Sequence, residues 1–493
     1  METLSTCTAV SELAAILDDA VADYPDLCAI STETEHITYA ELGGRVATLA
    51  GRLRDVGVGP DRIVAVHVPR SATAIIAIHA VIATGAVVAP LDANDPPERV
   101  GALLDQAGAS HLIVADREQS ATEIGEGLAV VRRDVAPTRL DPGYLLFTSG
   151  STGVPKGVLL SDRAVAHFAR WAAESVGLAS DDRVAAQASL TFDLSTFDVF
   201  STAAAGATAV IFPDWLKPFP ADTVDWLAEQ RITALYGVPT LVKGIVAAGG
   251  RSSTLPDLTT VLFAGEPYPV AALADLQTAF PDAAIGNWYG PTETNVCTAF
   301  DIRQWRPGTP VPIGGAIDGV RVAIVEDELV VAGPTLLTGY VVDGVVSDPA
   351  TDIVFPDGRT RRAYRTGDRA YRDDDGQLVL LGRVDRQIKR SGYRIDLSGI
   401  ETVASDVGSV HGAAVVVAGD DERLVLFVDV DPASTAVLET IDHALRGALP
   451  SYSLPDRVVA YTPLPTNRRG KVDLPRLEEL AAHILTDQQE AQA

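Results

Sequence analysis

The sequence predicts an α/β protein with a large N-terminal domain, a β-rich subdomain and a small, mobile α+β C-terminal domain. Short runs rich in Val, Ile and Leu alternate with helical patterns in the first part of the chain, at residues 62–68, 207–212, 232–236 and 260–263. Buried runs that alternate with helices indicate parallel sheets sandwiched by helices on both faces.

The pattern of expected secondary structure changes after about Asp318. Short strand patterns separated by turn signals, such as Asp357-Gly358 and Asp375-Gly376, indicate a β-rich subdomain. The end of the chain has its own strand patterns, at 413–417 and 424–428, with amphipathic helical segments.

A domain boundary is expected near Asp385. Residues 1–384 then form the N-terminal core, and residues 385–493 form a lid domain. A loop with Gly470 followed by Lys471 precedes the last helical segment, far in sequence from the phosphate-type loop described below. This placement suggests a small domain that swings a lysine over the main one.

Composition excludes several classes of protein. The chain of 493 residues is too long for one core, and its 47% hydrophobic and 21% charged residues are ordinary for a folded protein. Its 39 basic and 66 acidic residues give a net charge of -27, which disfavours a nucleic acid as the main partner.

Targeting and redox signals are also missing from the sequence. The three cysteines, Cys7, Cys28 and Cys297, have no CxxC spacing, so neither a disulfide framework nor a structural zinc site is expected. The N-terminus carries acidic residues where a signal peptide needs basic ones, and no apolar run approaches the roughly 20 residues of a membrane span. We therefore expect a cytoplasmic protein without a membrane partner.

The densest chemical signal is residues 144–158, an apolar strand that ends in hydroxyls, glycines and a lysine. Glycines let backbone N–H groups approach an anion closely, hydroxyls add donors, and Lys156 adds a point charge. The spacing is not that of a Walker A loop. A Ser/Gly-rich surface turn is the alternative, but the flanking strand and lysine favour a nucleoside triphosphate site. The residues concerned are Thr148, Ser149, Gly150, Ser151, Thr152, Gly153 and Lys156.

A second signal is the segment 287–297, with sequence NWYGPTETNVC. Asn287 offers an amide that can read an adenine edge, and Tyr289 offers a flat face that can stack on it. Thr292 can donate to a phosphate, and Glu293 is a hard oxygen ligand suited to Mg²⁺. A plain Gly-Pro turn explains such a concentration of suitable residues poorly.

Three charged residues are candidate site residues because of the motifs in which they stand. Asp368 follows a tight turn and suits the paired hydroxyls of a ribose, and Arg383 can donate to the same sugar. Each of these, like Lys471, would by itself be read as a solvated surface charge.

These motifs resemble, in content and order, those of the acyl-adenylate-forming superfamily. The segments TSGSTGVPKG, FDLS, NWYGPTET, YRTGD, GRVDRQIKRSGYRID and NRRGKVD are most similar to the amino-acid-activating adenylation domains of nonribosomal peptide synthesis. The match runs from about residue 12 to residue 475. Leu380 departs from it, since the family often places an aromatic residue there, near the adenosine.

The resemblance implies a role for each matching residue. Residues 148–156 would hold the β- and γ-phosphates of ATP, with Gly265 added to the nucleotide site. Asn287 and Tyr289 would hold adenine, Thr292 the α-phosphate, Glu293 the Mg²⁺, and Asp368 and Arg383 the ribose. Lys471 would act in adenylation, with Thr292 and Glu293 beside it, Asp385 would be the hinge, and Gly392 would lie in the loop used for thioester formation.

The implied chemistry is consistent with these residues. Attack of a carboxylate on the α-phosphorus brings two anions together, so catalysis requires charge neutralisation and in-line positioning. Lys471 and Mg²⁺ would supply the positive charge while pyrophosphate leaves. Rotation of the lid would then remove Lys471 and admit a thiol.

The resemblance also implies an amino acid substrate, because Asp193 in the FDLS segment matches the family's acidic residue that pairs with a substrate α-ammonium group. A carboxylate that faces a carboxylic substrate makes sense if the substrate also carries an α-ammonium group, whereas plain acyl- and aryl-CoA ligases lack this residue. The alternative is that Asp193 caps the segment that follows. The other pocket positions of the family are apolar apart from one hydroxyl: Leu194, Phe197, Tyr236, Leu262, Ala264, Trp288, Val296 and Cys297.

This pocket resembles that of free-standing prolyl ligases, which load a separate phosphopantetheinylated carrier protein. Trp288 is bulkier than the aliphatic residue expected there, so glycine, alanine or a smaller ring remain alternatives to L-proline. No carrier-attachment sequence follows Lys471, so we expect a stand-alone ligase. Rival readings are a D-alanine–carrier ligase, an acyl- or aryl-CoA ligase, and a non-catalytic nucleotide-binding regulator.

Overall fold

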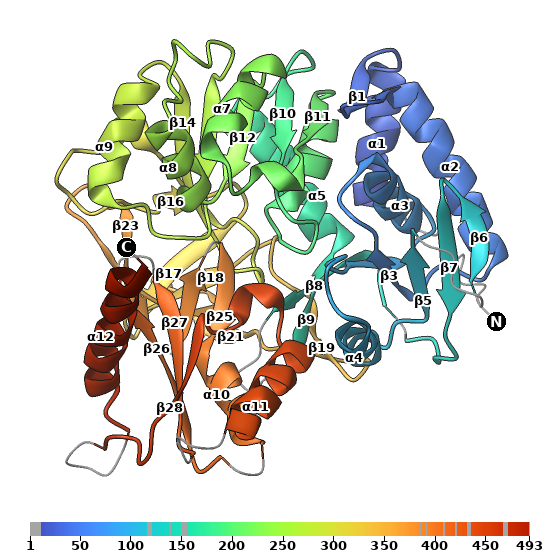
Figure 1. Ribbon diagram of the computed structural model, residues 1–493. Helices are drawn as coiled ribbons and strands as arrows, with labels where there is room; N and C mark the ends of the chain where they lie inside the picture. Colours follow the sequence, from blue (N-terminus) through green and yellow to red (C-terminus); the bar gives the residue numbers. More distant parts are fainter. Residues whose placement is uncertain are drawn as a thin grey trace. The chain divides into compact units, whose positions relative to one another are not determined.

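The computed structural model describes most of the chain as two compact units. The first comprises residues 1–93, 104–147 and 157–384, and the second comprises residues 94–103, 148–156 and 385–493. The described residues are 11–115, 121–138, 140–148, 155–384, 386–390, 392–407, 410–419, 422–430, 435–466 and 472–492. Figure 1 shows the elements along the chain.

A nine-stranded sheet carries most of the candidate site. Its six central strands, from β14 to β1, run parallel, and antiparallel strands close both edges. The strands in spatial order are β16 (Gly315–Ala316), β15 (Thr298–Asp301), β14 (Ala284–Tyr289), β13 (Thr260–Phe263), β12 (Ala234–Gly237), β10 (Arg183–Ala186), β11 (Thr208–Ile211), β1 (Cys28–Ser31) and β2 (His36–Thr38). The prediction of a parallel sheet is confirmed.

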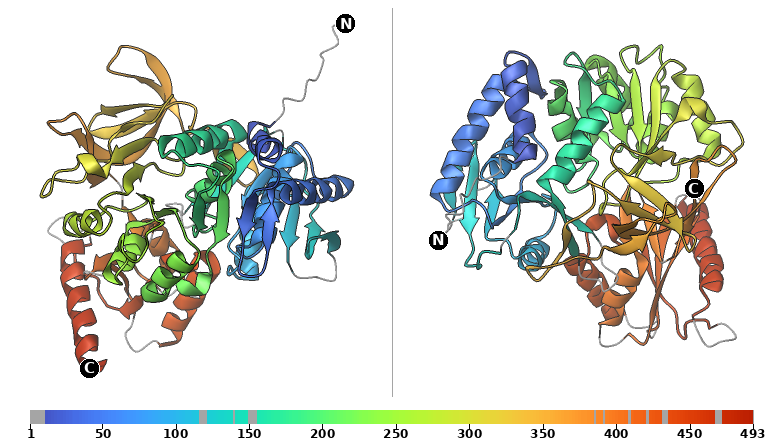
Figure 2. Two further views of the ribbon diagram at one scale, coloured as in Figure 1. Left: turned by 90° about the horizontal axis from the view of Figure 1, so that it is seen from above. Right: turned by 180° about the vertical axis from the view of Figure 1, so that it is seen from behind.

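Helices cover both faces of this sheet (Figures 1 and 2). On one face α7 (Pro220–Glu229), α8 (Pro239–Ala247) and α9 (Val270–Ala279) bury their apolar residues in a shared core with β11–β14. On the other face lie α5 (Asp162–Ser175), the π-helix η1 (Phe197–Ser201) and α6 (Thr202–Ala204). Two short 3-10 helices, η2 (Asp214–Leu216) and η3 (Ile302–Gln304), complete this part.

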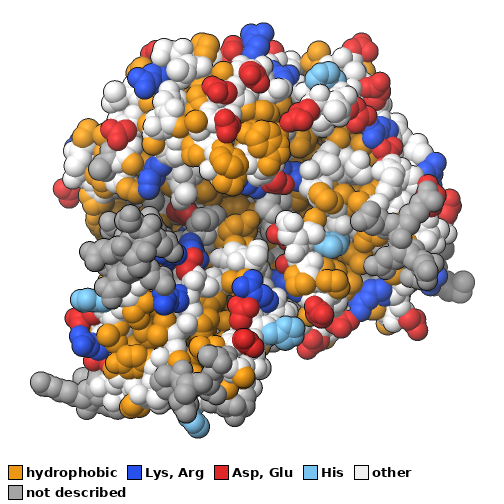
Figure 3. All heavy atoms as spheres, in the orientation of Figure 1, with side chains coloured by type: hydrophobic (Ala, Val, Ile, Leu, Met, Phe, Trp, Pro, Cys, Tyr) orange, Lys and Arg blue, Asp and Glu red, His pale blue; other side chains and the backbone are white. Residues whose placement is uncertain are grey.

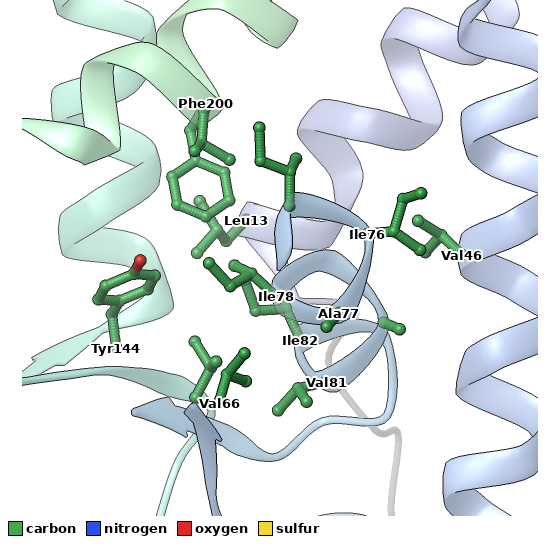
Figure 4. Close-up of a cluster of buried hydrophobic side chains, with 14 of the residues drawn as sticks. Leu13, Val46, Val66, Ile76, Ala77, Ile78, Val81, Ile82, Tyr144 and Phe200 are labelled. Carbon is green, nitrogen blue, oxygen red and sulfur yellow. The ribbon is translucent and has the colours of Figure 1, made fainter. Parts of the chain in front are cut away.

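A second nine-stranded sheet packs around a buried helix, α3 (Ala72–Ala83). Almost every side chain of α3 is buried, which explains its nearly continuous apolar sequence. Figure 4 shows Ile78 of α3 between Val66 of the sheet, Tyr144 and Phe200. The strands in order are β20 (Val345–Ser347), β19 (Gly339–Val342), β9 (Lys156–Ser161), β8 (Gly143–Thr148), β4 (Val87–Pro90), β3 (Ile63–His67), β5 (His111–Val114), β7 (Leu128–Arg132) and β6 (Thr122–Gly125).

Three further helices flank these strands: α1 (Glu12–Asp23), α2 (Tyr39–Asp55) and α4 (Pro97–Ala107). Helix α2 begins with a capping box, in which the Thr38 hydroxyl accepts from Glu41 N and the Glu41 carboxylate accepts from Thr38 N. The box satisfies two backbone donors and fixes the start of the helix.

The β-rich subdomain expected after about Asp318 is present as an antiparallel five-stranded sheet. Gly358 and Gly376 have φ of 77° and 79°, as their predicted Asp-Gly turns require. The strands are β17 (Arg321–Val325), β18 (Glu328–Ala332), β22 (Thr360–Arg372), β21 (Thr351–Val354) and β23 (Leu378–Arg383).

The C-terminal part of the second unit is an α+β structure with its own cores. Its strands are β24 (Gln387–Arg390), β25 (Tyr393–Asp396), β26 (Ala413–Ala418), β27 (Arg423–Val428) and β28 (Arg457–Ala460). Its helices are α10 (Leu397–Ser405), α11 (Thr435–Ala448), α12 (Leu474–Gln492) and the short η4 (Ser451–Ser453). The predicted fold class is confirmed, while the mobility of this domain stays a prediction.

The surface carries charged side chains of both signs, as the composition indicates. In the face drawn in Figure 3, acidic and basic side chains are interspersed with hydrophobic ones. Among the residues described above, no helix is both long and apolar enough to cross a membrane.

Candidate functional site

The predicted substrate residues come together in the first unit. Leu194, Phe197, Tyr236, Leu262, Ala264, Trp288, Val296 and Cys297 all belong to one buried hydrophobic cluster. The sheet register explains part of this, because Tyr236 pairs with Leu262 on the neighbouring strand. Asp193 lies in the turn between β10 and η1 and is 5% exposed.

Trp288 is the centre of an aromatic group in this cluster. Its ring centroid lies 5.1 Å from that of Tyr236 and 5.8 Å from that of Phe197. Gly286 makes room for the indole, because a Cβ there would lie 3.2 Å from Trp288 Nε1 and 2.8 Å from Leu262 Cδ2.

Sequence reasoning missed two rings that support Trp288 from helix α5. The centroid of Trp171 lies 5.0 Å from that of Trp288, and the centroid of Phe168 lies 6.3 Å away. Their spacing of three residues on an amphipathic helix places them on one helix face, a signal that was available in the sequence.

Polar atoms within this apolar surface are few. Burial raises the pKa of the Tyr236 hydroxyl well above its usual value, and the Asp193 and Asp198 carboxylates add to the effect. Tyr236 therefore keeps its proton at neutral pH, and its buried oxygen has no hydrogen-bond partner among the described residues. A buried carboxylate and a phenol oxygen that can accept a hydrogen bond suit a ligand that is apolar except for a charged amine, because an ammonium group only donates.

The turn that carries Asp193 is fixed by hydrogen bonds. The Thr196 hydroxyl donates to the Asp193 carbonyl at 2.6 Å, and Asn295 Nδ2 donates to the Thr196 oxygen at 3.1 Å. A further hydrogen bond joins the residues on either side of this turn: Ala188 N donates to the Asp198 carboxylate at 2.9 Å. Burial raises the pKa of the Asp198 carboxyl to about 7. Asn295 thus connects the Asp193 turn to the loop of Thr292 and Glu293.

Asp368, predicted to bind the ribose, contacts two of the other predicted nucleotide residues. Tyr289 donates its hydroxyl to Asp368 Oδ2 at 2.5 Å, and Arg383 forms an ion pair with Asp368 Oδ1 at 2.8 Å. Asp368 and Arg383 are register partners on β22 and β23. Their side chains are 6% and 10% exposed, so neither is a solvated surface charge.

The other predicted adenine residue lies on the same strand as Tyr289. Asn287 is buried and donates from Nδ2 to the carbonyl of Pro312 at 2.7 Å, which fixes the orientation of its amide. Burial, and next the charge of Asp368, raises the pKa of Tyr289 well above its usual value, so this phenol stays protonated. Gly265, just after β13, has φ of 90°.

Glu293 is fully buried in the loop after β14 and accepts a hydrogen bond from the Tyr340 hydroxyl at 2.8 Å. The loop turns tightly at Gly290, where a Cβ would lie 1.6 Å from the Asn295 carbonyl oxygen. No group of three His, Cys, Asp or Glu side chains that could hold a metal occurs in the described part of the chain. A lone buried carboxylate still fits Mg²⁺, which is often bound by one or two carboxylates plus substrate phosphates.

Several predicted residues lie at the margins of the described chain. Thr148 ends β8, Lys156 begins β9, and Gly392 has φ of 82° beside β25. Ser149, Gly150, Ser151, Thr152 and Gly153 of the phosphate loop, the hinge residue Asp385 and the catalytic candidate Lys471 lie outside the described residues.

A sequence profile described as AMP-binding enzyme matches residues 17–341. The chain belongs to the AMP-binding enzyme family. ATP is the nucleotide that enzymes of this family use. The sequence-based identification of the superfamily is therefore confirmed.

Two relatives and one solved structure match over nearly their whole length. An L-proline–[L-prolyl-carrier protein] ligase of Pseudomonas fluorescens is 32% identical over 92% of this chain and 96% of that protein. A ligase with the same description from Streptomyces coelicolor is 33% identical over 90% of this chain and 92% of that protein. An artificially fused adenylation–PCP di-domain protein from Klebsiella oxytoca has a similar structure, with 25% identity, a TM-score of 0.76, and coverage of 90% of this chain and 93% of that chain.

Replacing Trp288 with leucine is expected to shift substrate preference toward bulkier amino acids. Loss of the indole would open apolar space within the cluster, and a difference of about one methylene is worth roughly 10- to 200-fold in discrimination. Relative kcat/KM values for proline, alanine, valine and leucine measure this change. Trp226→Leu is the matched control, because Trp226 is a buried tryptophan that packs on Phe212 in a different core. An unchanged preference profile in Trp288→Leu would contradict the pocket assignment.

Proposed function

We propose that this chain activates a small apolar amino acid, with L-proline as the first candidate, and loads it onto a carrier protein. The observation that carries the proposal is a buried cluster of the predicted substrate residues that is apolar and aromatic except for a carboxylate, Asp193, and a phenol, Tyr236. The similarity to two L-proline–[L-prolyl-carrier protein] ligases supports both the substrate and the carrier.

The reaction would proceed in two steps. In the first, an oxygen of the amino acid carboxylate attacks the α-phosphorus of ATP, the bond between this phosphorus and the bridging oxygen breaks, and pyrophosphate leaves. In the second, the phosphopantetheine thiol loses its proton, its sulfur attacks the acyl carbon, and AMP leaves.

Residues of the first unit would bind the nucleoside. Asp368, already held by Tyr289 and Arg383, would accept hydrogen bonds from the ribose hydroxyls. Asn287 and Tyr289 would contact adenine, and Thr292 would donate to the α-phosphate. Glu293 would supply the carboxylate oxygen for Mg²⁺, which offsets phosphate charge when bound.

Substrate selection would depend on Asp193. Its carboxylate would pair with the α-ammonium group, while the cluster around Trp288 would enclose the side chain. Nothing among these wall residues would satisfy a second charge on the substrate, and an unpaired buried charge costs several kcal/mol. Acidic, basic and amide amino acids would therefore be rejected.

Residues 148–156 would hold the β- and γ-phosphates, and the domain of residues 385–493 would move as a lid about Asp385. In its first position the lid would supply Lys471, and in its second Gly392 would enter the thioester-forming site. A cytoplasmic location stays a prediction.

A second candidate is glycine or alanine, including D-alanine. The observation that favours it is the packing of Trp288, whose indole is held by rings of Phe197, Tyr236, Phe168 and Trp171. An indole fixed in this way leaves less room for a side chain than an aliphatic residue would.

Amino-acid-dependent ATP–pyrophosphate exchange tests these proposals. We expect a dominant L-proline signal when the proteinogenic amino acids, D-alanine and small cyclic analogues are compared. A dominant glycine or alanine signal would favour the second candidate. Exchange with carboxylic acids that lack an amine, and none with amino acids, would contradict both.

A further inference from the structure

Glu293 is held by a short chain of two tyrosines. Its Oε1 lies 2.8 Å from the Tyr340 hydroxyl, and that hydroxyl lies 2.9 Å from the hydroxyl of Tyr364. Leu337 N also donates to the Glu293 carbonyl at 2.8 Å, which ties the backbone of the loop to the segment just before Tyr340.

The number of protons available decides which group donates in each of these two hydrogen bonds. The hydrogen bond between the two residues runs from the Tyr340 hydroxyl to the Glu293 carboxylate. An ionised carboxylate can only accept, and a phenol has a single proton to donate. Tyr340 therefore donates to Glu293, and Tyr364 must donate to Tyr340.

The two tyrosines sit on strands, whereas Glu293 sits on a loop. Tyr340 is on β19, where it pairs with Val158 of β9, two residues after Lys156 in the sequence. Tyr364 is on β22 and pairs with Val331 of β18. Groups on strands are positioned more accurately than groups on loops, so the strands can fix the direction of the carboxylate.

We propose that Tyr340 and Tyr364 are positioning residues that aim the Glu293 carboxylate at the Mg²⁺ that accompanies ATP. Tyr340 acts directly on Glu293, and Tyr364 acts through Tyr340. This inference rests on the proposed function, because that function gives Glu293 its role toward the metal. Partners that orient a metal-binding carboxylate generally matter for metal affinity, with losses of about 10- to 100-fold on their removal.

Tyr340→Phe removes one oxygen and with it both hydrogen bonds of the chain. We expect it to weaken Mn²⁺ binding, measured by electron paramagnetic resonance with α,β-methylene-ATP, by about tenfold. The Mg²⁺ concentration for half-maximal pyrophosphate exchange should rise by a similar factor. Tyr364→Phe removes only the outer bond and should have a smaller effect of the same kind.

The double variant Tyr340→Phe/Tyr364→Phe gives the sharpest test. If Tyr364 acts through Tyr340, the double variant should bind Mn²⁺ no more weakly than Tyr340→Phe alone. Effects that multiply would mean that the tyrosines act independently and would overturn the proposed chain.

Tyr39→Phe is the matched control, since Tyr39 is also buried and donates its hydroxyl to the carbonyl of Ala207 at 2.6 Å. This variant should lose thermal stability without any change in Mn²⁺ affinity. Wild-type Mn²⁺ affinity in Tyr340→Phe would overturn the positioning role and leave the proposed function intact. Failure of the wild-type protein to bind Mn²⁺ and the nucleotide analogue would overturn both.

Discussion

Asp193→Asn is expected to lose nearly all amino-acid-dependent pyrophosphate exchange. The change keeps the shape of a side chain that is 5% exposed but removes the charge that would pair with the substrate ammonium group. Loss of one partner of a buried, hydrogen-bonded charge pair costs about 2–5 kcal/mol, or roughly 30- to 5,000-fold in kcat/KM. Exchange assays at varied proline concentration measure the loss.

A second measurement separates this effect from damage to the nucleotide site. Affinity for α,β-methylene-ATP should be unchanged in Asp193→Asn, since the carboxylate is assigned to the amino acid alone. Asp162→Asn is a suitable control, because Asp162 is a buried carboxylate that accepts from Glu12 N and Arg163 N instead. Equal losses in the two variants, or exchange retained in Asp193→Asn, would remove Asp193 from the substrate site.

Parts of this site were predictable because strand ends and turns are local features of a sequence. The apolar runs at 232–236 and 260–263 became neighbouring parallel strands, and that pairing sets Tyr236 beside Leu262. The Asp-Gly turns and the buried strand before the phosphate-type loop also followed from residue type alone. Placement of the pocket residues needed the family resemblance, since no periodicity relates Asp193 to Cys297.

Other features depend on contacts that no local pattern encodes. Tyr340 belongs to a strand that pairs with β9, so its approach to Glu293 depends on sheet register and side-chain rotamer together. The link from Asn295 through Thr196 to the Asp193 carbonyl joins residues about a hundred positions apart. Asn295 itself has φ of 49°, a conformation that asparagine tolerates better than most residues.

The pairing of Asp368 with Arg383 shows how burial changes the meaning of a charged residue. In the sequence each side chain could be a solvated surface charge, whereas in the structure they form a mostly buried ion pair. Removing one partner of such a pair typically costs about 3–5 kcal/mol, because the remaining charge stays buried. Variants of Asp368 would therefore report on stability as well as on the proposed ribose binding, which makes Asp193 and Lys471 cleaner probes of the proposed chemistry.

Lys471→Ala is expected to lower pyrophosphate exchange by about 10²- to 10³-fold, the usual effect of removing one group that stabilises developing charge. The first step brings a carboxylate to a phosphate, so loss of the cation that Lys471 is proposed to supply would raise its barrier directly. Thioester formation from synthetic prolyl-AMP should be much less affected, because Lys471 leaves the site before that step in the proposed two-position cycle. Stopped assays of the two half-reactions measure the two rates separately.

The rates of the two half-reactions in Lys471→Ala show whether the lysine acts in adenylation alone or in both steps. Lys243→Ala is the control, since Lys243 is exposed on α8 and has no assigned role in either step. If Lys471→Ala slows both half-reactions equally, the lysine binds the adenylate in both positions of the lid, and the domain movement about Asp385 loses its support. If it slows the first alone, the lysine acts in adenylation only, as the proposed two-position cycle expects.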